Sequence, residues 1–374
     1  MAGMYSPIIT AYGTQFFGIA QLSITHVHIR KECFMRIAFA GTGYISKIHA
    51  QAARNLGLTL SAVVNHQTAS MADFAQTFGI PRQYTEISDL ISDGHVDAIV
   101  IATPNYLHTP QSIAALSAGL HVMVEKPMAM NADQALQMHQ VAQHHRATLM
   151  VAHCWRFDRD VLWLKERMPA LGKVIRTTGY GIHTHWGPSG WFTQQQYAGG
   201  GALADMGIHA IDTVRFLLGD PHPRSVYAKI GTHYGNYDVD DTAVLMIEWD
   251  NGTHSVIESG WWQPHMDGPE AATKIYGTTG FGQIFPTRTV VPTADRTDVI
   301  TDTAGFPFPR ESHCPQALYD AQLAYFVDCV RHGRTPTPGG AEGIVNMQII
   351  DAAFASARSG NAVQIAPLPT RSES

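Results

Sequence analysis

The sequence contains few cysteines, few charged residues and no long hydrophobic run. Its four cysteines show no C-x-x-C spacing, which indicates neither a disulfide framework nor a zinc ribbon, so we expect reduced thiols and a cytoplasmic protein. Charged residues make up 15% of the chain and the formal net charge is −6, so no basic field favours nucleic acid or a membrane surface. No apolar run reaches the roughly 20 residues of a membrane-spanning helix. These absences favour a small-molecule partner.

The length of the chain predicts two domains. With 374 residues it is longer than one hydrophobic core usually grows. We place the first domain at residues 35–155 and the second at residues 156–374. Residues 1–34 have no basic segment followed by an apolar stretch and no helical period, so they resemble neither a signal peptide nor an element of the fold. We expect them to be a dispensable extension, with Met35 as the functional start.

A glycine-rich turn begins the first domain. Residues 35–46 (MRIAFAGTGYIS) change from an apolar run to glycines and then to a helical pattern, which predicts a strand, a tight turn and a helix. Gly41 permits the turn, and Gly43 lets a ligand approach the backbone. The unpaired N–H groups of the new helix, at Tyr44 and Ile45, would hold the diphosphate of a dinucleotide. An ordinary strand–helix turn is the alternative.

Strands and helices continue to alternate through the first domain. Apolar strands are expected at residues 58–64, 97–102, 121–124 and 148–153. This pattern predicts a parallel sheet covered on both faces, as in a Rossmann-type domain. The residue that ends the second strand of such a domain contacts the adenosine ribose, and Asn65 and His66 present no carboxylate there. We expect NAD or NADP, with a slight preference for NADP; two exposed turn residues are the alternative.

Two later loops at the carboxyl ends of strands carry polar side chains, where an open α/β sheet binds its ligand. The first loop offers hydroxyl, amide and imidazole groups after a buried strand, with Thr103, Pro104, Asn105 and His108. The second loop is Glu125-Lys126-Pro127, which places a lysine at the edge of the sheet and a proline that fixes the chain direction.

In this order and spacing, the Gly-x-Gly-x-x-Ser turn, the Ala-Thr-Pro-Asn-x-x-His loop and Glu-Lys-Pro resemble the glucose-fructose oxidoreductase / inositol dehydrogenase (Gfo/Idh/MocA) family. The resemblance extends from Met35 to about Gly360, and Glu-Lys-Pro is its most specific mark. It implies a dinucleotide cofactor held by these loops, and an assembly of two or four identical chains. It also implies that Arg156, after the last Rossmann strand, lies near the cofactor or substrate.

A different pattern follows residue 155. Strands are expected at residues 173–183, 225–230, 241–249, 253–260 and 274–276, and they predict a largely antiparallel sheet. Helices would cover one face and leave the other open as an oligomer surface. The final helices, at about residues 317–331 and 341–358, would pack back onto the body. The expected fold class is therefore α/β followed by α+β.

One helix, at residues 199–219, interrupts these strands after a run of three glycines and ends on Gly219. Asp205, His209 and Asp212 have the spacing i, i+4 and i+7, so they share a stripe of the helix. A surface ion pair of little energetic value is the alternative. The family resemblance implies an Asp-x-x-x-His helix that faces the nicotinamide, so we expect Asp205 and His209 in the active site.

The reaction expected at this site is hydride transfer between a carbinol carbon and the nicotinamide. This reaction also requires that the hydroxyl group of the substrate lose its proton. We assign this task to His209, because an imidazole with an unperturbed pKa of about 6.5 suits it. By resemblance, Lys126 hydrogen-bonds the same oxygen or shares the proton, and Asp205 binds a neighbouring hydroxyl and keeps the lysine cationic. Whether Lys126 or His209 is the ultimate base stays open. His183 and His185 would lie on one face of a strand; hydrogen bonding to a polyol explains these imidazoles, and no metal is expected.

The leading hypothesis is an NAD(P)-dependent oxidoreductase that acts on a sugar, cyclitol or related polyol. One alternative is an enzyme that retains NAD and cleaves glycosides by transient oxidation. Another is a non-enzymatic dinucleotide-binding regulator, which would be expected to lack the lysine and the histidine. Four aromatic side chains near the site loops would either stack on a sugar or pack in the core, namely Trp186, Trp191, Trp261 and Trp262. Surface or packing positions are expected for His49, His139, His144 and His145.

Overall fold

The computed structural model describes residues 35–264, 270–310, 312 and 315–367. The expectation for residues 1–34 therefore lies outside the described part of the chain. Within that part, no helix has both the length and the apolar character needed to cross a membrane.

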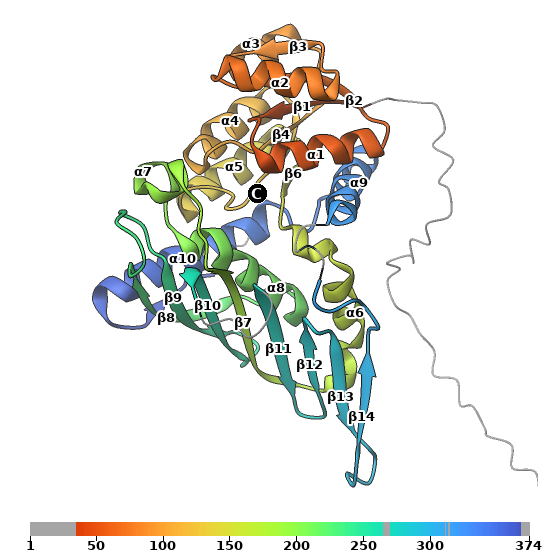
Figure 1. The fold of residues 1–374 in the computed structure, drawn as a ribbon, viewed down its shortest axis with the longest axis vertical. Helices are drawn as coiled ribbons and strands as arrows, with labels where there is room; N and C mark the ends of the chain where they lie inside the picture. The colour runs from red at the N-terminus through yellow and green to blue at the C-terminus, as the bar shows by residue number, and fades with distance from the viewer. Residues whose placement is uncertain (1–34, 265–269, 311, 313–314, 368–374) are drawn as a thin grey trace, which may run out of the picture. The chain divides into compact units, whose positions relative to one another are not determined.

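Six parallel strands form the first sheet, in the order β3-β2-β1-β4-β5-β6 (Figure 1). The central strand β4 has the sequence AIVI, and all of it is buried because helices cover both faces. The predicted parallel Rossmann sheet is confirmed. The sequence pattern missed the short edge strand β3. The strand bounds are β1 Arg36–Ala40, β2 Thr59–Val64, β3 Arg82–Tyr84, β4 Ala98–Ile101, β5 His121–Val124 and β6 Leu149–Val151.

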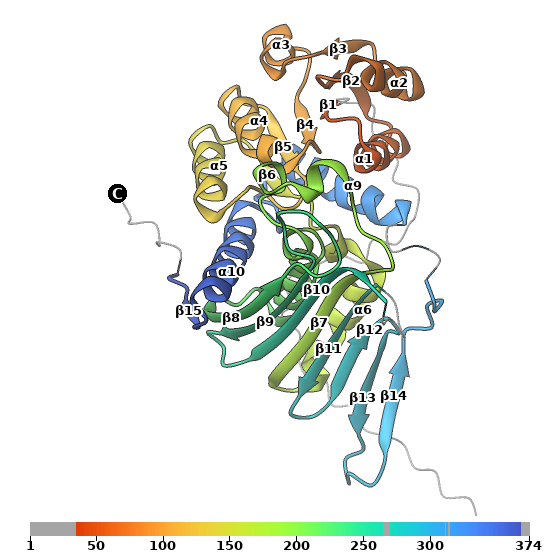
Figure 2. The ribbon, with the colours of Figure 1, turned by 60° about the vertical axis from the view of Figure 1, so that its left-hand side comes forward.

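Helices from both ends of the chain cover this sheet. On one face α1 packs against α9, and on the other α5 packs against α10 (Figures 1 and 2). Alternate residues of β4 take part in different hydrophobic clusters, Ile99 on the side of α10 and Val100 on the side of α9. The helices are α1 Tyr44–Asn55, α2 Thr68–Phe78, α3 Ile87–Asp93, α4 Asn105–Ser117, α5 Ala132–His144, α9 Gln316–His332 and α10 Gly340–Ser359.

Nine strands form the second sheet within the described residues, in the order β14-β13-β12-β11-β7-β10-β9-β8-β15. Most neighbours are antiparallel, but β7 and β10 are parallel. The predicted, largely antiparallel sheet is confirmed and is larger than expected. Its strands are β7 Val174–Thr184, β8 Pro223–Gly231, β9 Thr242–Trp249, β10 His254–Gln263, β11 Ala271–Gly277, β12 Phe281–Ile284, β13 Arg288–Pro292, β14 Val299–Thr303 and β15 Val363–Gln364.

The helices of the described residues cover one face of the second sheet. The helix α8 (Ile208–Leu218) packs on β7, β10 and β11, and α10 packs on β8. Residues of β9 alternate between buried and exposed, so Leu245 is fully buried while Val244 and Met246 are exposed. Figure 2 shows that no described helix lies over the exposed face. This alternation is the pattern of an antiparallel sheet with one open side.

Short helical segments lie between β6 and β7, where the chain passes from the first sheet to the second, and between β7 and α8. They place the residues of the candidate site between the carboxyl ends of the first sheet and the second sheet. The segments are the 3-10 turns η1 Cys154–Phe157, η2 Met168–Leu171 and η3 Gly190–Thr193, the helices α6 Arg159–Arg167 and α7 Gln195–Ala198, and the π-helical turn η4 Leu203–Gly207.

Candidate active site

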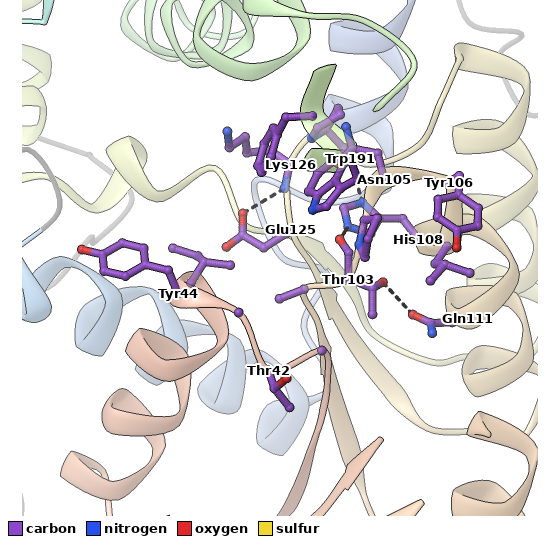
Figure 3. Close-up of a pocket in the computed structure, with 18 of the residues that line it drawn as sticks. Thr42, Tyr44, Thr103, Asn105, Tyr106, His108, Gln111, Glu125, Lys126 and Trp191 are labelled. Atoms are coloured by element: carbon purple, nitrogen blue, oxygen red, sulfur yellow. Dashed lines mark hydrogen bonds between the residues drawn. The ribbon is translucent and has the colours of Figure 1, made fainter. Parts of the chain in front are cut away.

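One pocket, with a volume of about 1090 Å³, lies where β1, β4 and β5 end and extends to α8 (Figure 3). Most of the residues proposed from the sequence line it. These are Gly41, Gly43, Tyr44, Ile45, Asn65, His66, Thr103, Pro104, Asn105, His108, Glu125, Lys126, His183, Asp205 and His209. Of the residues expected at the site, Arg156 and His185 are not among those that line it.

The glycine turn has the shape that a dinucleotide requires. Gly41 has a φ of +95°, and a Cβ there would lie 2.4 Å from the carbonyl oxygen of Ala102. Gly43 precedes α1 and makes no side-chain cap, and in the described part of the chain no heavy atom beyond its own neighbours lies within 4 Å of a Cβ built on it. The first N–H groups of α1 therefore face open space beside the positive end of the helix dipole. These residues fit a diphosphate, and so fit a dinucleotide cofactor.

A small polar cluster follows β2. The Asn65 amide donates to the hydroxyls of Thr42 at 2.6 Å and Ser70 at 3.0 Å. His66 is exposed at the pocket wall. No carboxylate occurs in residues 65–70 (NHQTAS), but Glu86 also lines the pocket.

The polar side chains of the Thr103–His108 loop bind other parts of the protein. The ring of His108 lies between the carbonyl oxygens of Thr103 and Pro127, 2.9 and 2.8 Å from its two nitrogens. The Asn105 amide donates to the carbonyl of Ala198 at 2.8 Å. We therefore interpret His108 as the group that holds the two ligand loops together, and Asn105 as the group that ties the first loop to α7. The surfaces of these residues still line the pocket (Figure 3).

Glu125 is fixed by a buried histidine. Its Oε1 lies 2.7 Å from Nε2 of His49 on α1, and its Oε2 accepts from the backbone N–H of Lys126 at 3.1 Å. Burial opposes ionisation of Glu125, but the hydrogen bond and charge of His49, together with Lys126, outweigh burial and lower the pKa of the carboxyl. His49 is thus a packing residue, as one of the two expectations had it, with a specific partner that periodicity did not reveal.

Lys126 reaches across to the second half of the chain. Its Nζ donates to Asp205 Oδ1 at 2.8 Å and to the Asp205 carbonyl at 3.0 Å. Burial lowers the pKa of Lys126, but Asp205 and Glu125 together outweigh burial and raise it, so the lysine is cationic at neutral pH. Burial likewise opposes ionisation of Asp205, but Lys126 holds the pKa of Asp205 far below its usual range.

Asp205 lies in the π-helical turn η4, not in a regular α-helix. Such turns occur frequently at functional sites. Asp240 holds the start of the turn, because its carboxylate accepts from the N–H groups of Gly201 at 2.7 Å and Leu203 at 2.8 Å. A Cβ on Gly201 would lie 1.8 Å from the Asp240 carbonyl oxygen. This glycine is therefore required for close packing.

His209 follows at the start of α8. Its ring is buried and stacks on Trp155, with centroids 4.9 Å apart and planes at 26°. Burial, together with the charge of Lys126, holds the pKa of His209 well below its ordinary value. The imidazole is therefore neutral at neutral pH, which is the form that can accept a proton.

The third residue of the helical stripe, Asp212, does not serve the pocket. It binds the guanidinium of Arg156 through two contacts of 2.8 Å and also accepts from Asn346 at 2.9 Å. Arg156 binds Asp220 as well, at 2.6 Å. The expectation that Arg156 contacts the cofactor or substrate is not supported, because two carboxylates already hold it. We therefore do not propose it as a ligand.

The two strand histidines separate. His183 lies in β7 and lines the pocket, whereas His185 follows the end of the strand, has a φ of +58° and is exposed. The expected shared face is wrong because the extended backbone ends between them. No group of three or more His, Cys, Asp or Glu side chains with the arrangement of a metal site occurs among the described residues.

Several residues of the pocket were not foreseen or only loosely placed. Of the four tryptophans expected near the site loops, Trp186 and Trp191 line the pocket and Trp262 is not among the lining residues. Trp261 is buried, and its indole N–H donates to Asp205 Oδ2 at 3.1 Å. Figure 3 shows Trp191 beside Lys126 and Asn105. No sequence signal indicates that Tyr319 of α9 lines the pocket, because α9 is distant along the chain from the other lining residues. The unforeseen lining residues include Thr42, Tyr106, Gln111, Cys154, Phe192, Met206 and Tyr319.

Comparisons with known proteins agree with this geometry. Residues 35–153 match the family "Oxidoreductase family, NAD-binding Rossmann fold", and residues 169–281 match the "GFO/IDH/MocA C-terminal domain". The chain is 26% identical to D-glucoside 3-dehydrogenase of Escherichia coli K12, over 88% of this chain and 97% of that protein. It is 27% identical to scyllo-inositol 2-dehydrogenase (NAD+) of Bacillus subtilis, over 88% and 96%.

Among solved structures, levoglucosan dehydrogenase in complex with NADH and levoglucosan shares the fold. The TM-score is 0.79 with 24% sequence identity, over 89% of this chain and 100% of that chain. The chain therefore belongs to the Gfo/Idh/MocA family of oxidoreductases, and its first sheet is an NAD-binding Rossmann fold.

Proposed function

We propose that this oxidoreductase transfers a hydride between the nicotinamide of NAD or NADP and a hydroxyl-bearing carbon of an uncharged sugar, cyclitol or related polyol. The observation that carries the proposal is the meeting of Lys126, Asp205 and His209 in the pocket that the glycine turn also lines. The names of the relatives support it, because they act on a glucoside and an inositol.

His209 is proposed as the base. The bound nicotinamide supplies the hydride acceptor or donor. His209 accepts the hydroxyl proton, since burial and Lys126 keep its imidazole neutral. Lys126 donates a hydrogen bond to the same oxygen and stabilises the negative charge that develops there. In this proposal the work is divided between a neutral imidazole and a cationic amine.

Asp205 is proposed to maintain this division. Its Oδ1 binds Lys126 and keeps the amine charged, while the carboxylate has further lone pairs for a neighbouring substrate hydroxyl. The charge balance also favours an uncharged substrate. Lys126 is the one lysine or arginine among the described lining residues, and Asp205 already neutralises it. A sugar phosphate or sugar acid would find no free lysine or arginine among them.

We further propose that NADP is accepted as well as NAD. The end of β2 offers the amide of Asn65 and the imidazole of His66, and no carboxylate that would repel a 2′-phosphate. Comparing kcat/KM for the two cofactors tests this, and an enzyme that uses NAD alone would contradict it. Asn65→Asp should shift the preference toward NAD.

The open face of the second sheet is proposed as the contact surface of a homodimer or homotetramer. Val244, Met246 and Tyr227 are exposed on adjacent strands of this face. The buried thiol of Cys329, which forms no disulfide with a described residue, supports a reducing, cytoplasmic location. Light scattering of the purified chain would measure the number of chains in the assembly. A monomer at micromolar concentration would refute the proposed homodimer or homotetramer.

A panel of sugars, cyclitols and polyols with NAD and NADP tests the main proposal. The expected result is an increase in reduced-nicotinamide absorbance with at least one neutral compound. His209→Asn should slow this increase by roughly 10²- to 10⁴-fold while retaining cofactor binding. If glycosides are cleaved without net formation of reduced cofactor, the transient-oxidation alternative replaces simple dehydrogenation.

A further inference from the structure

Glu270 is an acid that no sequence motif marked, yet the sheet fixes it beside the pocket. It directly precedes β11, where Ala271 pairs with Gly181 of β7, and the Glu270 carbonyl accepts from the N–H of Ile182 at 2.8 Å. This register places Glu270 next to His183. The position of the acid is therefore set by backbone pairing between two strands.

The carboxylate of Glu270 makes several contacts with β7 and the residues after it. Its Oε1 accepts from the indole N–H of Trp186 at 2.5 Å and from the backbone N–H of Thr184 at 3.2 Å. Its Oε2 lies 3.5 Å from Nδ1 of His183. The ring of His183 also stacks on Trp186, with centroids 3.5 Å apart. Glu270 thus holds the indole of Trp186 by a hydrogen bond and places its charge beside the ring of His183.

The other nitrogen of His183 faces the catalytic groups. Its Nε2 lies 3.6 Å from Asp205 Oδ2, and Asp205 Oδ1 lies 2.8 Å from Lys126 Nζ. Lys126, Asp205, His183 and Glu270 therefore form a row in which basic and acidic groups alternate. The adjacent strand β10 contributes Trp261, an uncharged donor to Asp205. The charged groups that face His183 are thus the two carboxylates, with Lys126 beyond Asp205.

We propose that Glu270 is a positioning residue for the hydride transfer. Its carboxylate keeps the His183 imidazole protonated with Nε2 toward Asp205, so that Asp205 is shared between two cations and leaves Lys126 available to the substrate oxygen. The inference rests on the proposed function of the pocket. It adds a residue that touches neither the substrate nor the cofactor.

The electrostatics of the row agree with this role. Burial lowers the pKa of His183, but Asp205 and Glu270 outweigh burial and raise it above its ordinary value. Burial opposes ionisation of Glu270, but His183 and Trp186 lower its pKa. When His183 loses its proton, the row loses one positive charge close to the developing alkoxide, and Asp205 then attracts Lys126 alone. Oxidation should therefore slow as the pH rises through the pKa of His183.

The test compares Glu270→Gln with Glu258→Gln in the cofactor-bound protein. Gln keeps the acceptor for Trp186 but removes the charge, so the alkaline limb of kcat/KM should move down by roughly one pH unit. Glu258, exposed on β10 and paired with Tyr180 of β7, controls for loss of a carboxylate that forms no ion pair with His183, and its variant should leave the limb in place. The Trp186→Phe variant removes the indole N–H but retains the charge, so it should also leave the limb in place, whatever its rate.

Histidine imidazole NMR measures the same effect without turnover. The signals of His183 are those missing from the spectrum of His183→Gln, and their titration midpoint should fall by roughly one unit in Glu270→Gln. An unshifted midpoint, or a loss of rate that is equal at every pH, would overturn the proposal. If no polyol is oxidised by the wild-type chain, the proposed function fails, while the NMR titration still decides the link between Glu270 and His183.

Discussion

Two glycines of one turn are expected to fail in different ways when alanine replaces them. Gly41 has a φ of +95°, and its new Cβ would lie 2.4 Å from the backbone oxygen of Ala102. The left-handed backbone contributes roughly 1–2 kcal/mol and the clash roughly 1–3 kcal/mol, so Gly41→Ala should lower the free energy of unfolding by roughly 2–5 kcal/mol. The loss should be present without any cofactor.

Gly43→Ala should leave stability almost unchanged and weaken cofactor binding. Gly43 has φ −70° and ψ −174°, which any residue adopts, and no protein atom lies within 4 Å of its Cβ position. The free energy of unfolding should therefore change by less than about 0.5 kcal/mol. The methyl group enters the space reserved for the diphosphate, and a penalty of roughly 1–3 kcal/mol raises Kd by roughly 5- to 150-fold.

Urea unfolding of the cofactor-free protein and fluorescence titration with NADH and NADPH measure the two effects. Gly57→Ala separates backbone strain from the clash, because Gly57 has a φ of +67° with no atom within 4 Å of its Cβ. It should show only the conformational loss of roughly 1–2 kcal/mol. Wild-type affinity for both nucleotides in Gly43→Ala would refute the assignment of this turn as the diphosphate site.

Three further predictions concern buried groups. His209→Asn should lower kcat by roughly 10²- to 10⁴-fold without changing cofactor Kd, and unchanged turnover would reject His209 as the base. Arg156→Leu should lower the free energy of unfolding by roughly 3–5 kcal/mol, because Asp212 loses a buried partner; an unchanged urea midpoint would show that the pair is not structural. Burial lowers the pKa of His153 from its ordinary value of 6.5 to about 4, so the unfolded chain takes up this proton first as the pH falls. Stability should therefore decline by roughly 3 kcal/mol between those two pH values, and His153→Gln should flatten this decline in urea unfolding measured across the range.

The parallel sheet and its ligand edge could be predicted because their causes are local. An all-apolar strand such as Ala98–Ile101 requires cover on both faces, and the glycines at residues 41 and 43 specify a turn before a helix. In a parallel sheet, loops after successive strands meet at one edge. This rule alone placed Thr103 and Lys126 beside the glycine turn.

The short strand at residues 82–84 and the three short strands between residues 281 and 303 were not predicted, because the cause of these strands is not local. The strand β3 is three residues long and β14 is exposed throughout, so neither carries a hydrophobic alternation. Their pairing partners, not their own composition, make them strands. Periodicity also placed Asp212 with Asp205 and His209, but it cannot show which buried neighbour a side chain meets.

The sequence by itself determined the alternation of strands and helices in the first domain, the glycine turn and the loop that carries Lys126, because these depend on local spacing and on where strands end. The roles of Lys126 and His209 were expectations that the family resemblance added. Only the tertiary structure decided that Arg156 is held by Asp212 and Asp220, that His49 holds Glu125, and that Glu270 lies beside His183. The physical reason is that a buried charge is stabilised by a partner brought close in space, and separation along the chain does not indicate that partner.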